Sequence, residues 1–101
     1  MAMRLDRRRL GPCTRVWNDW ASTFVYLLNS DADPDRFYTG LTCDVGARLK
    51  AHNAGDSPRT AAGRPWRVIV AIEFADQERA VRFEKYLKSG SGRAFAGRHF
   101  R

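Results

Sequence analysis

The sequence predicts a small α+β domain, in which a three-stranded, mainly antiparallel sheet is flanked by helices in the order β-β-α-β-α. Two β-rich segments separated by an Asp-rich, Pro-containing loop at 29–36 indicate a β-hairpin. A third apolar strand at 66–74 lies between two segments whose apolar residues have helical spacing. A chain of 101 residues has room for one domain with a single core.

The first strand is expected at 23–28. Every residue from Phe24 to Leu28 is apolar or aromatic, so both faces should be covered, as in a central strand. Its hairpin partner is expected at 36–40 (RFYTG), where the final glycine allows a close approach of backbone or ligand. Each strand carries one tyrosine, Tyr26 or Tyr38.

The first helix is expected to begin after a cap at Thr42 or Asp44 and to end at Gly55. Four of its residues fall within one arc of roughly 100°: Val45, Arg48, Leu49 and His52. A purely structural helix would place Arg48 and His52 opposite the apolar anchors. Their position on the apolar face therefore makes them candidates for a site.

The second helix is expected from Gln77 to about Ser89, with Asp76 as its cap. Its inward stripe consists of Ala80, Phe83 and Leu87. Glu84 lies within the same arc and must have a partner, because an isolated carboxylate against apolar surface is costly. That partner is either an arginine of the body or a functional ligand. The remaining tail is glycine-rich and basic, and we expect it to pack through its two phenylalanines, Phe95 and Phe100.

The net charge of +7 is concentrated at the two ends of the chain, because the acidic and basic residues within 23–87 cancel. Basic ends suit a polyanion such as DNA, although they are also typical of a soluble basic surface. No apolar run approaches the roughly 20 residues needed to cross a bilayer, so we expect a cytoplasmic protein with no membrane partner.

The two cysteines, Cys13 and Cys43, are expected to be free thiols, because neither has a second thiol near it in sequence. A zinc site would have to combine them with His52 and His99. These spacings match no finger or ribbon pattern, so zinc is not expected.

Five residues from different elements form a candidate polar pocket beside the sheet: Tyr26, Tyr38, Arg48, His52 and Glu84. Such a set suits phosphoryl transfer, because a carboxylate can hold Mg²⁺ and an arginine complements phosphate charge. His52 is the better unassisted base, since free His titrates near ~6.5 and free Tyr near ~10. Tyr26 would need a metal or Arg48 to lower its pKa, so the identity of the base stays open.

Several segments together resemble the GIY-YIG endonuclease superfamily, specifically its small single-domain bacterial members. They are Phe24-Val25-Tyr26, Tyr38-Thr39-Gly40, the stretch from Gly40 through Arg48 to His52-Asn53, Arg64-Pro65-Trp66, and the helix at 80–88. The resemblance covers about 23–89. It divides the chain into a basic N-terminal extension at 1–22 and a nuclease-like domain at 23–101.

The resemblance implies a metal-dependent hydrolase of DNA phosphodiester bonds, with structure-directed cutting in repair or recombination as one expectation. Tyr26 would activate water, Tyr38 would orient water or phosphate, Arg48 would steady the scissile phosphate, His52 would accept a proton, and Glu84 would bind Mg²⁺ or Mn²⁺. Five further basic residues are candidates for phosphate contact or simply for solvation: Arg59, Arg64, Lys88, Arg93 and Arg98.

The chain departs from the family pattern in two places. The first motif begins with Phe24 instead of glycine, and the asparagine that some relatives carry after the metal helix has no counterpart at 89–92. The second departure supports an alternative, a nucleic-acid-binding module that uses the same fold without turnover. A third hypothesis is a protein-interaction module with Trp17 and Trp20 as its contact patch.

Overall fold

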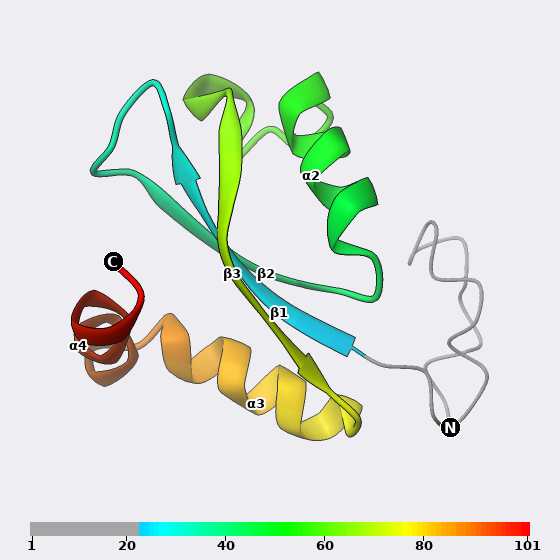
Figure 1. Cartoon of the computed structure of the whole chain (residues 1–101), viewed down its shortest axis with the longest axis vertical. Helices are drawn as coiled ribbons and strands as arrows, with labels where there is room; N and C mark the ends of the chain where they lie inside the picture. The colour runs from blue at the N-terminus through cyan, green and yellow to red at the C-terminus, as the bar shows by residue number, and fades with distance from the viewer. Residues whose placement is uncertain (1–22) are drawn as a thin grey trace.

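The fold is known from a computed structural model that describes residues 23–101. Its elements in chain order are β1 (Thr23–Ser30), β2 (Phe37–Thr42), α2 (Val45–Ala54), the 3₁₀ turn η2 (Ala61–Gly63), β3 (Trp66–Phe74), α3 (Gln77–Leu87) and α4 (Gly90–His99). The strands form one antiparallel sheet in the order β2-β1-β3 (Figure 1). This confirms the predicted α+β fold class.

The sheet has a different apolar cluster on each face. On one face Val25 and Leu27 pack with Ala80 and Leu87 of α3 and with Ala96 of α4. On the other face Tyr26, Leu28 and Trp66 pack against α2, through Val45 and Leu49. Alternate residues of β1 are therefore buried against different helices, as expected for a central strand that is apolar on both faces.

The hairpin register places Tyr26 opposite Gly40, and Leu28 opposite Tyr38. The loop between the strands is closed by the Ser30 amide, which donates to the Arg36 carbonyl at 3.0 Å. β1 and β2 are both longer than expected, since they extend to Ser30 and to Thr42 respectively. The hairpin thereby fixes the relative positions of the two tyrosines.

Both predicted helix caps are present. The Asp44 carboxylate accepts the Ala47 amide hydrogen at 3.0 Å, and α2 ends at Gly55, whose φ of 85° is left-handed. The Asp76 carboxylate accepts the Glu78 amide hydrogen at 2.9 Å at the start of α3. These caps set the phase of each helix and so decide which side chains face the sheet.

The C-terminal segment adds an element that the predicted order β-β-α-β-α lacked, because Gly90–His99 forms helix α4. The Ser89 hydroxyl accepts the Gly92 amide hydrogen at 3.1 Å, so α3 ends at Leu87 and Ser89 caps the next helix. This helix was not predicted from the sequence, because the segment is rich in glycine and glycine has a low intrinsic helix propensity. Phe95 and Phe100 pack against the α3 side of the core, as predicted.

Cys43 takes part in a disulfide bond, so the expectation of free thiols was wrong for this residue. Separation in sequence is a poor guide to the distance between two sulfur atoms in a fold. The predictions for residues 1–22, including the patch of Trp17 and Trp20, lie outside the described residues. None of the helices in the described part of the chain is long and apolar enough to cross a membrane.

Candidate active site

A buried hydrogen-bonded chain joins the first strand, the first helix and the loop that follows it. The Tyr26 hydroxyl lies 2.9 Å from His52 Nε2, and His52 Nδ1 lies 2.7 Å from the Thr60 hydroxyl. The side chains of all three residues are almost fully buried. Tyr26 and His52, which sequence analysis proposed separately, are therefore directly coupled.

The neighbours of His52 determine its tautomer. The Thr60 hydroxyl donates to the Ser57 carbonyl at 3.5 Å, so it accepts a hydrogen from His52 Nδ1. Nε2 then carries a lone pair and accepts the Tyr26 hydroxyl hydrogen. The imidazole is thus oriented by Thr60 to act as a proton acceptor for Tyr26.

Burial raises the pKa of Tyr26 above its ordinary value of 10.0, so Tyr26 is a neutral phenol near pH 7. The Arg48 side chain opposes this shift through a hydrogen bond and through its positive charge. Electrostatic interactions with Tyr38 and Glu84 raise the pKa of Tyr26 further. The Tyr26 oxygen therefore has a proton acceptor in His52 and a cation that would stabilise a phenolate in Arg48.

Burial, followed by the positive charge of Arg48, lowers the pKa of His52 below its ordinary value of 6.5. His52 is therefore neutral at pH 7 and stays neutral into the mildly acidic range. Because an unfolded chain would protonate this histidine near pH 6.5, the unfolded state binds more protons between the folded pKa and 6.5. The free energy of unfolding should accordingly fall as the pH falls below about 6.5.

This linkage can be measured by urea unfolding of the protein and of a His52→Gln variant between pH 8 and pH 5.5. We expect the stability of the wild-type protein to decrease more steeply below pH 6.5 than that of the variant. Other titrating groups are common to both proteins, so their contributions cancel when the pH dependence of the free energy of unfolding is compared between the two. Equal slopes would contradict the assignment of His52 as a buried neutral imidazole.

Tyr38 completes the aromatic part of the site. Its ring contacts His52 edge-on, with 4.8 Å between ring centroids, and lies 6.2 Å from the Tyr26 ring. Unlike Tyr26, it is only partly buried. Tyr38 is thus the tyrosine that a molecule approaching from solvent can reach directly.

Gly40 makes room for the Tyr26 side chain. A Cβ atom at Gly40 would overlap the Cζ and hydroxyl oxygen atoms of Tyr26, so the tyrosine lies across the glycine on the neighbouring strand. The Tyr-Thr-Gly segment therefore has two separate roles. It supplies Tyr38, and it leaves the space that Tyr26 occupies.

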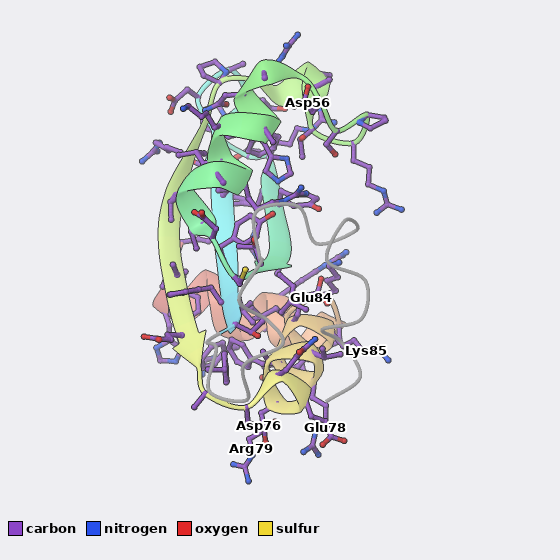
Figure 2. All side chains as sticks on the ribbon, turned by 90° about the vertical axis from the view of Figure 1, so that its right-hand side faces the viewer. Asp56, Asp76, Glu78, Arg79, Glu84 and Lys85 are labelled. Atoms are coloured by element: carbon purple, nitrogen blue, oxygen red, sulfur yellow. The ribbon has the colours of Figure 1, made fainter. Side chains whose placement is uncertain are left out.

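Glu84 lies on α3, and Figure 2 shows it on the side of the helix toward α2, whereas Asp76, Glu78 and Arg79 project from the opposite side. Its side chain is 16% exposed, and the Lys88 ammonium lies 2.5 Å from its carboxylate. Sequence analysis left two partners open for Glu84, an arginine of the body or a functional ligand, and the structure pairs it with a lysine one turn away. Within residues 23–101, the Glu84 carboxylate forms its ion pair with Lys88 and not with Arg48.

A single carboxylate fits a divalent metal such as Mg²⁺, which often binds proteins through one carboxylate and keeps its other ligands as water or substrate oxygens. The ammonium group of Lys88 lies at the Glu84 carboxylate, so this position already holds one cationic group. No group of three or more potential metal ligands occurs among the described residues. A metal at Glu84 would therefore depend on oxygen atoms of water and substrate for the rest of its coordination.

An open groove of about 630 Å³ lies along the free edge of β2 and adjoins this site through Tyr38 and Thr60. Three of the five predicted phosphate-contact residues line the groove: Arg59, Lys88 and Arg93. Arg64 and Arg98 lie outside it. The Arg64 side chain instead donates to the Ala61 carbonyl at 2.8 Å.

Sequence analysis missed three polar residues of this region, Thr60, Arg36 and Arg101. Thr60 is one of several polar residues in a loop, and nothing in the sequence distinguishes it as the partner of His52. Arg36 and Arg101 line the groove from the hairpin loop and from the C-terminus. Asn53, in contrast, has a structural role, because its amide exchanges two hydrogen bonds with the backbone of Trp66.

The sequence of this chain was compared with models of known protein families. The family model described as the GIY-YIG catalytic domain matches residues 22–97, a range that includes all five predicted site residues. The chain belongs to the GIY-YIG family. The roles of the individual residues remain predictions.

Three relatives illustrate the range of the GIY-YIG family around this chain. The "Structure-specific endonuclease subunit SLX1" of Scheffersomyces stipitis is 42% identical over 67 residues, which are 59% of this chain and 20% of that protein. The "UPF0213 protein BH0048" of Halalkalibacterium halodurans is 35% identical over 71 residues, 69% of this chain and 73% of the relative. The solution NMR structure of UPF0213 protein BH0048 from Bacillus halodurans covers 78% of this chain and 86% of its own, with a TM-score of 0.48 and 29% identity.

The two kinds of relative differ in length. This chain matches only a fifth of the SLX1 protein but about three quarters of the UPF0213 protein. The match to SLX1 is therefore a match to one part of a longer nuclease subunit.

Proposed function

We propose that this GIY-YIG protein is a divalent-metal-dependent endonuclease that hydrolyses DNA phosphodiester bonds. The observation that supports the proposal most directly is the buried hydrogen-bonded chain of Tyr26, His52 and Thr60, together with the electrostatic influence of Arg48 and Glu84 on Tyr26. It combines a proton route, a cation for phosphate charge and a carboxylate for a metal. The name of the SLX1 relatives, a structure-specific endonuclease subunit, supports structure-directed cutting, for which we propose branched DNA as the substrate class.

The proposed proton route uses Tyr26 and His52 as a pair. As water attacks phosphorus, its proton passes to the Tyr26 oxygen while the Tyr26 hydroxyl proton passes to His52 Nε2. This exchange avoids a free phenolate, which the raised pKa of Tyr26 makes unfavourable near pH 7. The imidazolium that results is held by Thr60 through Nδ1–H.

The partly exposed residues of the site are proposed to bind the substrate. Arg48 would donate to the oxygens of the scissile phosphate, where negative charge develops. Tyr38 would position the water or the phosphate, because it can be reached from solvent. Glu84 would hold a divalent metal, which supplies electrostatic stabilisation of the phosphate and of the leaving oxygen when bound.

One observation favours a second candidate, a nucleic-acid-binding module without turnover. The Lys88 ammonium already neutralises the Glu84 carboxylate, and this ion pair would have to separate for a metal to bind. In such a module Lys88 and the arginines of the groove would contact phosphates. Metal-dependent cleavage distinguishes the two candidates.

The test is nicking of labelled DNA by the pure full-length protein. Single-stranded, duplex, flap and branched substrates would each be incubated with Mg²⁺, Mn²⁺ or EDTA. We expect cleavage with either metal, none with EDTA, and the highest rate on a substrate that contains a branch. Salt-sensitive binding without cleavage on any substrate would reject the enzyme in favour of the binding module.

A further inference from the structure

The groove along the edge of β2 has a strongly asymmetric charge. One acidic side chain, Asp35, lines it. The basic side chains that line it number five: Arg36, Arg59, Lys88, Arg93 and Arg101. These residues come from the hairpin loop, the loop after α2, the end of α3, and α4 with its C-terminal residue. Segments that are far apart in the sequence thus place positive charge around one groove, which suits a polyanionic ligand.

Core residues of the domain lie beneath this basic rim. Leu27, Leu87 and Ala96 reach the groove from the sheet and from the two C-terminal helices. The Arg101 guanidinium lies over the Phe37 ring, 4.4 Å from its centroid, and donates to the Arg93 carbonyl at 3.1 Å. These two contacts hold a planar cationic group at the wall of the groove, where a base can stack on it.

The groove also meets the candidate active site at three points. Tyr38 lines the groove and also belongs to the candidate active site. Thr60 lines the groove and orients His52. Lys88 lines the groove and pairs with Glu84. A strand whose scissile phosphate lies at Arg48 and Glu84 can therefore continue directly into the groove past Tyr38.

We propose that this groove binds a short single-stranded nucleic-acid segment next to the bond to be cut, an inference that rests on the proposed nuclease function. A volume of about 630 Å³ is in the range of a small-ligand site, which is enough for one or two nucleotides and too small for a duplex. A basic rim with the planar Arg101 guanidinium in its wall matches a strand whose base faces are exposed, whereas a duplex offers mainly phosphates. The groove would thus select DNA in which a strand is unpaired at the cleavage site.

The test is binding of fluorescently labelled oligomers by the full chain in EDTA, so that no cleavage takes place. Oligo(dT), oligo(rU) and a duplex of equal length would be titrated over a series of salt concentrations. We expect the single strands to bind more tightly than the duplex. The comparison of dT with rU reports whether the 2′-hydroxyl affects affinity.

Two groove variants and one control locate the binding. The double variant Arg36→Ala/Arg93→Ala should reduce the slope of log affinity against log salt by about 1.4, because each phosphate contact of a single strand contributes about 0.7. Arg101→Ala should weaken single-strand binding about tenfold through loss of the stacking surface. Arg98→Ala removes the same charge from the same helix outside the groove and should change little.

Three results would overturn the proposal. They are equal losses in the Arg98 control and the groove variants, equal or tighter binding of the duplex, and displacement of oligo(dT) by poly-glutamate at the same charge concentration. The last result would indicate a site for any polyanion. Because binding is measured without metal, a protein that binds single strands but cleaves nothing would reject the nuclease function while retaining the groove assignment.

Discussion

Glu84→Gln is expected to reduce DNA cleavage by about three orders of magnitude while DNA binding in EDTA stays near the wild-type level. Glutamine has the shape of glutamate without its charge, so it cannot hold a divalent metal against the phosphate. Loss of metal stabilisation of a phosphoryl-transfer transition state costs several kcal/mol, and each 1.36 kcal/mol is a factor of ten in rate. Single-turnover cleavage of the preferred substrate measures the effect.

Stability should change little in this variant. The pair that is lost, Glu84 with Lys88, lies at the surface on the lysine side, where such pairs contribute about 0–1 kcal/mol. The matched control is Glu78→Gln, the same change in the first turn of the same helix, on the side away from α2 (Figure 2). Full cleavage by Glu84→Gln, or an equal loss in Glu78→Gln, would reject Glu84 as the metal ligand.

Gly40→Ala is expected to lower the cleavage rate by about a hundredfold, although Gly40 supplies no reacting group. The added methyl group would overlap the end of the Tyr26 side chain and push the hydroxyl away from His52. A misplacement of about 1 Å in a catalytic group can cost a factor of about a hundred. Overpacking should also lower the free energy of unfolding by about 1–3 kcal/mol.

The control for this steric effect is Gly97→Ala. A Cβ atom at Gly97 of α4 would meet open space, so the change should be neutral for cleavage and should stabilise the helix by about 0.5–1 kcal/mol. Urea unfolding and single-turnover rates would be measured for both variants. Wild-type cleavage by Gly40→Ala would indicate that the position of Tyr26 is less constrained than the structure implies.

Local patterns were sufficient to predict most of the fold. The double-sided apolar pattern of β1, the caps at Asp44 and Asp76, and the left-handed end of α2 at Gly55 all follow from short-range sequence rules. Helix α4 was missed because its glycines oppose helix formation locally. The packing of Ala96 and Phe95 against the core outweighs that preference.

For the candidate site, sequence by itself determined which residue types lie on which face of which element. The helical period puts Arg48 and His52 on the inner face of α2, and strand alternation puts Tyr26 and Tyr38 on the face of the sheet that packs against α2. These assignments depend only on the periods of helix and strand. They did not depend on how the elements pack together.

Only the tertiary structure decided how these residues act on one another. The coupling of Tyr26 to His52 and the orientation of His52 by Thr60 are set by distances between side chains that come from three separate segments of the chain. The direction of each pKa shift depends likewise on burial and on neighbouring charges, which exist only after folding. The basic groove has the same origin, because its five cations come from four separate segments and form no continuous run in the chain.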